Sequence, residues 1–243
     1  MRVACATDVG IMRKVNEDSC KSCMLTENSA CIIVCDGMGG AKGGDIASSM
    51  AAESIFEFVK KNFEESLSAE NVKNILINAI NTSNDDLFSY SKDNSEIQGM
   101  GTTVVLMIAT KGTLHVAHIG DSRGYIFTDE GLSQITMDHS YVQDLVNFGE
   151  ITPSEAKVHP RRNIITRVLG VHESVKCDYN SFYFPVGSSA IACTDGLTNF
   201  ADDSLILEYM KNQSGEELAK HLIDFANEMG GSDNITVAVI NND

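Results

Sequence analysis

The sequence has little of what divides or exports a protein chain. It contains three prolines, and no Pro/Ser-rich linker, charge block or low-complexity tract interrupts its 243 residues, a length that suits one large domain. The first residues lack the basic-then-apolar order of a signal peptide, and no apolar run approaches membrane-spanning length. We therefore expect one domain over residues 1–243, soluble and cytoplasmic, with no membrane partner, whether free or cut from a longer chain.

Basic residues are also scarce. Lys and Arg number 18 against 34 Asp and Glu, which gives a formal net charge of −16. Nucleic-acid binding depends on Lys and Arg to neutralise phosphates, so this balance argues against a nucleic-acid partner. Such acidity is typical of a solubilising surface, or of carboxylates that bound cations neutralise.

The seven cysteines offer no metal-binding or disulfide framework. Their number is odd and most lie in apolar segments, as expected of reduced thiols packed as small hydrophobic side chains. Cys20 and Cys23 form a single CxxC without a second Cys or His pair at zinc spacing. On a strand these two thiols would face opposite sides, so we expect neither a zinc site nor a redox pair there.

Hydrophobic periodicity indicates runs of strands and runs of helices rather than βαβ alternation. Helices are expected at 43–63, 68–87, 139–149, 202–212 and 215–229. Strands are expected at 2–9, 19–26, 30–35, 102–110, 113–119, 125–128, 177–184, 189–194 and 234–241. The polar stretch 152–163 is expected to form a surface excursion. This order predicts an α+β fold with largely antiparallel sheets.

Acidic residues stand where buried strands are expected to end. The apolar run 30–35 is typical of a strand buried on both faces, and Asp36-Gly37 follows it. The run 189–194 leads into Asp195-Gly196 in the same way. Further carboxylates stand at turns or strand ends: Glu17, Asp18, Asp121 and Asp233.

If these carboxylates share one cleft, their mutual repulsion requires cations among them. Oxygen ligands with room for water suit Mg²⁺ or Mn²⁺. Each aspartate taken singly is equally well explained as a turn former or a helix cap, and this alternative is weakest for the two buried runs that both end in Asp-Gly.

Two further motifs match known patterns in the wrong context. Gly120-Asp121-Ser122-Arg123-Gly124 fits G-x-S-x-G, which would make Ser122 a hydrolase nucleophile. That elbow needs a helix directly after the serine, whereas the residues 125–128 are aromatic and β-branched. In the glycine-rich stretch after Asp36, Lys42 stands where a dinucleotide loop needs its third glycine, and no G-K-[ST] follows. We expect neither a serine hydrolase nor a nucleotide-binding loop.

Short motifs follow one another along essentially the whole chain. They are Thr7-Asp8-Val9-Gly10, Arg13 with Asn16-Glu17-Asp18, Asp36-Gly37-Met38-Gly39-Gly40, Gly101-Thr102-Thr103, Gly120-Asp121-Ser122-Arg123, Asp138-His139-Ser140, His159-Pro160 with Asn163, Thr166-Arg167-Val168-Leu169-Gly170, Thr194-Asp195-Gly196 and Ser232-Asp233-Asn234. In this order and spacing they resemble the metal-dependent protein phosphatase (protein phosphatase 2C) family, specifically the small bacterial members that reverse Hanks-type Ser/Thr kinases. The resemblance implies a four-layer α-β-β-α sandwich of two antiparallel sheets flanked by helices, which agrees with the α+β pattern.

The resemblance also implies which groups hold metal ions. Asp36 would bridge two metals, and the Gly37 carbonyl would complete one of their shells. Asp195 and Asp233 would hold the second metal. Asp121 and Asp195 would be ligands of the third, weaker metal of bacterial members. The implied cofactors are therefore Mn²⁺ or Mg²⁺, two in the core site and a third at the weaker one.

Other residues are implied to act beside the metals. Glu17 and Asp18 would act mainly through metal-bound waters, and Arg13 would grip the substrate phosphate. Residues 141–163 correspond to a flap beside the site that influences substrate choice. A water shared by two cations loses its proton near neutral pH, and the hydroxide attacks phosphorus in line, without a covalent phosphoenzyme.

The implied activity is hydrolysis of phosphoserine and phosphothreonine in proteins, by a monomer that opposes a cognate Ser/Thr kinase. An inactive, phosphoprotein-binding pseudophosphatase is the alternative, which the full set of metal ligands disfavours. Met38 and Ala41 stand where eukaryotic and many bacterial relatives, respectively, carry a histidine. The proton donor is therefore unassigned: metal-bound water is the first candidate and His139 the second, although His139 equally suits bracing its loop.

Overall fold

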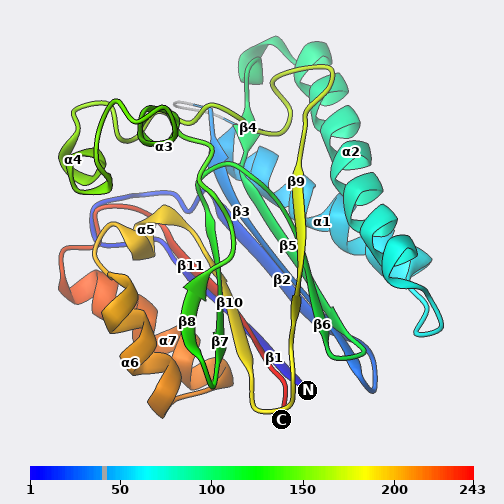
Figure 1. The fold of residues 1–243 in the computed structure, drawn as a ribbon. Coiled ribbons are helices and arrows are strands. Elements are labelled where there is room, and N and C mark those ends of the chain that lie inside the picture. Colours follow the sequence, from blue (N-terminus) through cyan, green and yellow to red (C-terminus); the bar gives the residue numbers. More distant parts are fainter. Residues whose placement is uncertain (40–42) are drawn as a thin grey trace.

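The computed structural model describes residues 1–39 and 43–243, and its centre is two packed antiparallel sheets (Figure 1). The first sheet has five strands in the order β1-β11-β10-β7-β8. Their bounds are β1 Arg2–Asp8, β7 Arg123–Thr128, β8 Gly131–Gln134, β10 Ser189–Cys193 and β11 Ile235–Asn241. The first and last strands of the chain pair along their whole length, from Arg2 opposite Asn241 to Asp8 opposite Ile235.

The second sheet has six strands in the order β2-β3-β5-β6-β9, with β4 paired to β3. Their bounds are β2 Asp18–Thr26, β3 Ser29–Met38, β4 Gly101–Thr102, β5 Val104–Thr110, β6 Thr113–Ile119 and β9 Asp178–Tyr183. The expected strand 102–110 is interrupted at Thr103, because the Thr103 N–H donates to the Asp36 carbonyl (2.8 Å) and turns the chain toward the end of β3.

Helices cover the outer face of each sheet (Figure 1). The helices over the six-stranded sheet are α1 Gly44–Asn62 and α2 Ala69–Asp93, and those over the five-stranded sheet are α6 Asp203–Asn212 and α7 Gly215–Glu228. As expected, Ser68 caps α2, its side chain accepting the Asn71 N–H. The layers run helix, sheet, sheet, helix, which confirms the α+β sandwich. None of the helices in the described ranges is long and apolar enough to cross a membrane.

Alternation along β3 shows how its sheet is buried on both faces. Ile33 and Cys35 pack in the core beneath α1 and α2, whereas Ile32 and Val34 pack in the core between the two sheets. Both rows are apolar, so the strand reads as one continuous hydrophobic run, as predicted. The next residue of the inner row is Asp36.

The two thiols of the CxxC point to opposite faces of β2. Cys20 packs against the core between the sheets, and Cys23 against the core beneath the helices. All seven cysteines are free. The prediction that these two thiols face opposite sides of the strand is confirmed.

Residues 141–163 form an arm with two short helices at the upper left of Figure 1. These are α3 Tyr141–Asn147, as expected, and α4 Pro153–Val158. The stretch 152–163 lies at the surface, as predicted, and α4 buries none of its residues. The helix itself was not predicted, although Thr152 and Glu155 form a complete capping box and Pro153 occupies the first turn, all of which favour a helix. Three other elements were not predicted: β8, the 3₁₀ turn Ser95–Ile97 and α5 Asp195–Thr198.

Candidate metal centre

The inner row of β3 leads into a carboxylate that faces another carboxylate. The sequence analysis places the end of the strand before Asp36, but β3 continues to Met38 and pairs there with β4. Asp18, the first residue of β2, lies directly opposite Asp36 in the β2–β3 ladder. Opposed residues of an antiparallel pair project from the same face, and like charges at such positions repel. The pair therefore calls for a compensating positive charge.

Each Asp-Gly motif needs its glycine because another backbone passes close by. At Gly37 a Cβ would collide with the Gly44 carbonyl oxygen at the start of α1, and with that of Glu17. At Gly196 a Cβ would collide with the Asn234 carbonyl oxygen. These contacts hold the two aspartate-bearing segments against the loops that carry the other acidic residues.

The five-stranded sheet contributes the second half of the site. Asp195 is the first residue of α5, directly after β10, and Asp233 lies in the turn before β11. Between them the Thr194 hydroxyl donates across the sandwich to Asp18 Oδ2 (2.9 Å) and accepts the Thr236 N–H (3.0 Å). The two sheets thus meet at this end through polar contacts instead of apolar ones.

The Asn234 side chain ties three segments together. Its Oδ1 accepts the Glu17 N–H (2.8 Å), and its Nδ2 donates to the carbonyls of Val9 (2.8 Å) and Val15 (3.0 Å). The sequence analysis includes Asn234 in a motif but assigns it no role. Nothing in one sequence distinguishes a bridging asparagine from one that only forms a turn.

Arg13 lies at the opening of the site. Its Nη2 donates to Asp233 Oδ2 (2.8 Å), and its Nη1 lies 3.9 Å from Glu17 Oε2. The side chain is 45% exposed, so part of its five-donor fork faces the opening. An arginine in this position can receive an anion from solvent.

The carboxylates of the centre are crowded. Burial raises the pKa of Asp36 well above its usual range, and the charges of Asp18, Asp195, Asp121 and Asp233 raise it further. Burial likewise raises the pKa of Asp18 to about 7 and that of Asp195 to about 6, with neighbouring carboxylates adding to both shifts. Such shifts are what negative groups undergo when they are held together without a counter-ion.

Asp121 stands in the turn between β6 and β7, close enough to Asp195 that this neighbour is the largest electrostatic cause of its raised pKa. Burial is the larger cause still, and together they raise the pKa of Asp121 to about 7. Its Oδ1 is buried and has no hydrogen-bond partner among the described residues. A buried acceptor without a donor fits a cation ligand, because leaving it unpaired is costly.

The structure thus brings together every acidic residue that the sequence singled out. Five of them act on one another through their charges: Asp18, Asp36, Asp121, Asp195 and Asp233. Glu17 joins the group through its ion pair with Arg13. Within residues 1–39 and 43–243, no three acidic, histidine or cysteine side chains are close enough to hold an ion by themselves.

His139 is arranged as a brace. Its ring Nδ1 accepts the Gly120 N–H (3.1 Å), and its backbone N–H donates to the Gly120 carbonyl (2.9 Å). Its ring Nε2 lies 3.3 Å from Asp178 Oδ2. Burial is the main cause that lowers the pKa of the ring, and a lowered pKa favours the neutral imidazole. Because Nδ1 accepts the Gly120 N–H, the proton of the neutral ring is on Nε2. This arrangement fixes the turn that carries Asp121 and favours bracing over proton donation.

The apparent nucleophile elbow is a turn between two strands. Ser122 lies between β6 and β7, and its buried hydroxyl shares a hydrogen bond with that of Thr103 (2.7 Å). A strand and not a helix follows the serine, as predicted. Of the two positions where relatives carry histidine, Met38 is partly exposed at the end of β3, and Ala41 lies outside the described residues, as do Gly40 and Lys42.

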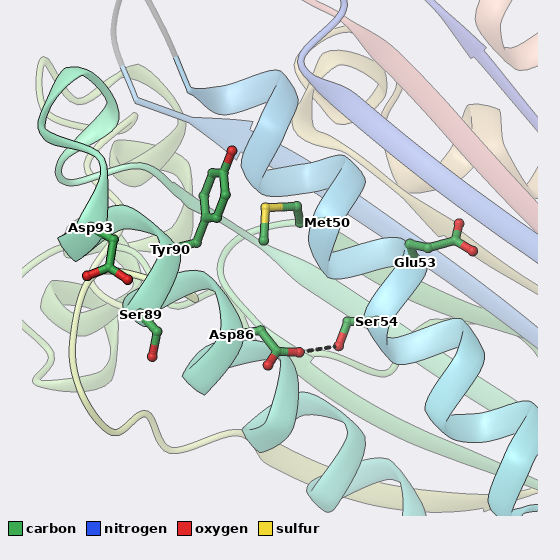
Figure 2. Close-up of a pocket in the computed structure, with 7 residues that line it drawn as sticks. All are labelled: Met50, Glu53, Ser54, Asp86, Ser89, Tyr90 and Asp93. Atoms are coloured by element: carbon green, nitrogen blue, oxygen red, sulfur yellow. Dashed lines mark hydrogen bonds between the residues drawn. The ribbon is translucent and has the colours of Figure 1, made fainter.

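A hollow of about 550 Å³ lies elsewhere, on the outer helical layer between α1 and α2. Figure 2 shows Met50 and Tyr90 lining it, with Ser54 of α1 hydrogen-bonded to Asp86 of α2. None of the predicted site residues lines this hollow. It therefore has no part in the carboxylate centre.

Comparisons with known proteins agree with the fold and the motifs. The profile of the family described as Protein phosphatase 2C matches residues 12–229. The serine/threonine phosphatase Stp of Listeria monocytogenes is 37% identical over 238 residues, 98% of this chain and 94% of that protein. The solved structure of the serine/threonine phosphatase Stp1 from Staphylococcus aureus superposes with a TM-score of 0.90 at 32% identity, covering 98% of this chain and 93% of that one.

A third relative was solved with metal. The catalytic domain of the serine/threonine protein phosphatase PstP, in complex with two manganese ions, superposes with a TM-score of 0.84 at 31% identity, covering 98% of this chain and 96% of that one. These matches define a metal-dependent serine/threonine protein phosphatase of the bacterial type. The chain belongs to the protein phosphatase 2C family, which confirms the resemblance drawn from its motifs.

Proposed function

We propose that this phosphatase holds two divalent cations, Mn²⁺ or Mg²⁺, with Asp36 between them. The Gly37 carbonyl would complete the shell of one ion, and Asp195 and Asp233 would hold the other. One observation carries this proposal: Asp36 shares its end of the sandwich with Asp18, Asp195 and Asp233. Among residues 1–39 and 43–243, Arg13 forms an ion pair with Asp233 alone of these four carboxylates. Two cations would supply the missing charge.

A third, weaker site is proposed at Asp121 and Asp195. Its support is the buried Asp121 Oδ1 without a partner among the described residues. Glu17 and Asp18 are proposed to act through waters. Asp18 fits this role because the Thr194 hydroxyl already occupies its Oδ2, which leaves the other oxygen to orient a water.

Bound cations of this kind supply a water nucleophile that ionises near neutral pH and offset the charge of the phosphate. The chain itself positions the substrate. Arg13 would fork two phosphate oxygens with its outward-facing donors and so align the ester for in-line displacement of the serine or threonine oxygen. His139 would keep the Asp121 turn in place without taking part in proton transfer. The first candidate of the sequence analysis, a water held by the metal ions, is therefore the proposed proton donor to the leaving group.

We propose further that residues 1–243 work as one catalytic unit and as a monomer. The core between the sheets, to which both contribute, supports the single unit. The arm at 141–163 is proposed as the flap that influences substrate choice. Phosphoproteins are the substrates, and a Ser/Thr kinase that makes them is the proposed opposing partner. Light scattering of the purified protein would test the monomer.

The test of the metal assignment is hydrolysis of p-nitrophenyl phosphate and of a phosphothreonine peptide, with Mn²⁺ and with excess chelator. We expect turnover of both substrates with Mn²⁺ and none with chelator. Asp233→Asn should lose most of this turnover, whereas Asp129→Asn, a matched change at an exposed turn between β7 and β8, should retain it. Turnover that survives chelation, or an Asp233→Asn variant as active as the Asp129→Asn control, would overturn the assignment.

A further inference from the structure

Three large apolar side chains project from the loop that carries Arg13. Ile11, Met12 and Val15 are 64%, 70% and 56% exposed, respectively. Apolar side chains scattered singly over a surface are ordinary. These three instead fall within five consecutive residues, on both sides of the arginine proposed to bind the substrate phosphate.

The backbone holds these side chains outward. The N–H groups of Ile11 and Met12 both donate to the Gly231 carbonyl, at 2.9 and 3.1 Å. At the other end of the loop, the Asn234 amide donates to the Val15 carbonyl (3.0 Å). These bonds fix the backbone of the loop at both ends while its apolar side chains stay exposed. Their exposure therefore belongs to a preorganised surface, which a ligand can cover without first ordering the loop.

We propose that Ile11, Met12 and Val15 form the contact surface for apolar residues that flank the phosphorylated serine or threonine of a substrate. The proposal rests on the proposed function, in which Arg13 holds the phosphate and so brings the peptide to this loop. Residues one or two positions from the phosphorylated one lie within about 7 Å of it in an extended chain. Ile11, Met12 and Val15 are likewise one or two positions from Arg13, so the two sets of side chains meet.

The occupant is the substrate because the surface is continuous with the phosphate-binding arginine. Val186, in the connection between β9 and β10, is 78% exposed. It precedes β10, whereas Asp195 follows the other end of that strand, and Figure 1 shows the connection at the bottom of the sandwich beside the C-terminus. It serves as the matched control for the loop.

The experiment compares two phosphothreonine peptides that differ only at the two positions beside the phosphothreonine, leucine in one and serine in the other. The measured quantity is the ratio of their kcat/KM values with Mn²⁺. The wild-type protein should prefer the leucine peptide about five- to tenfold, the discrimination expected of apolar side chains that are partly covered. A wild-type ratio near one, or below it, would refute the proposal without any variant.

Variants then locate the preference. Met12→Ser and Ile11→Ser should each reduce the ratio at least threefold, whereas Val186→Ser should leave it at the wild-type value. An unchanged ratio in both loop variants would also refute the proposal. Turnover of p-nitrophenyl phosphate, which has no flanking residues, reports separately on the metal-loaded centre: if it proceeds with Mn²⁺ while the peptide ratio stays near one, only this inference fails. If it does not depend on metal, the proposed function fails.

Discussion

Asp36→Asn separates the two roles of the carboxylate that bridges the proposed ions. Asparagine has nearly the same shape as aspartate but carries no charge. It removes the repulsion with Asp18, which lies opposite in the β2–β3 ladder. It also removes the charged ligand that the proposal places between two cations. Stability without metal and activity with metal should therefore change in opposite directions.

The stability change can be estimated from the ladder. Opposed side chains of an antiparallel pair are about 5 Å apart, and two like charges at that distance repel by about 3 kcal/mol at an effective dielectric constant near 20. At a pH at which both carboxylates are ionised, Asp36→Asn should thus stabilise the metal-free protein by up to about 3 kcal/mol. For a chain of this size, that corresponds to a Tm higher by up to about 6–12 °C.

The assay is a thermal melt in chelator and in Mn²⁺, alongside p-nitrophenyl phosphate turnover. Wild-type protein should gain stability from Mn²⁺, since an ion that binds only the folded state raises the Tm. Asp36→Asn should gain much less and should lose turnover at least about 100-fold, given the several kcal/mol that such ions contribute. A variant whose metal-free Tm falls below wild type, or that keeps near-normal turnover in saturating Mn²⁺, would refute the reasoning. Asp129→Asn controls for the substitution itself.

Three further predictions follow from the centre. Arg13→Ala should raise KM for a phosphopeptide about 10- to 100-fold with a smaller effect on kcat, because it removes charge-assisted hydrogen bonds to the phosphate. A fall in kcat of that size with an unchanged KM would contradict this. Ser122→Ala should keep chelator-sensitive turnover within a few fold of wild type and cost about 1 kcal/mol of stability, since among the described residues its hydroxyl shares a hydrogen bond with Thr103. Loss of turnover in a stably folded variant would instead support Ser122 as a catalytic nucleophile. In chelator, melting curves should show stability falling as pH rises from about 4 to about 7. The folded-state pKa values of Asp195 and Asp18 are raised to about 6 and about 7, so stability is lost as these two carboxylates ionise. Mn²⁺ should abolish this fall, and a stability that does not change with pH in chelator would contradict the prediction.

Most of the fold could be predicted because its helices carry apolar residues at the helical period and its central strands are short, continuous apolar runs. The limits of β3 could not. Its apolar run ends at Cys35, and the strand continues through Asp36 to Met38 only because β4, more than sixty residues later, supplies a partner. Pairing at that range leaves no local signal. The helix α4 was different: its capping box was present in the sequence and could have been used.

The acidic residues of the site could be predicted because carboxylates at the ends of buried runs are conspicuous. The residues that position them could not. Asn234 and Thr194 are polar side chains of types common in turns, and their roles depend on segments that only the folded chain brings near. Their contacts are to backbone groups or to residues far away in sequence. A single sequence holds no trace of such partners. His139 is the exception, since bracing was one of the two roles that the sequence offered for it.

These supporting contacts also explain how the chain tolerates its own centre without metal. The repulsion between Asp18 and Asp36 acts at one end of two sheets that enclose an apolar, buried core between them. The Thr194 hydroxyl donates to Asp18 across the gap, and hydrogen bonds to a carboxylate oppose the rise in its pKa. The core therefore bears the cost of assembling the acidic residues before any cation binds. Burial of the apolar core between the sheets stabilises the sandwich. This stabilisation offsets the repulsion among the acidic residues gathered at one end.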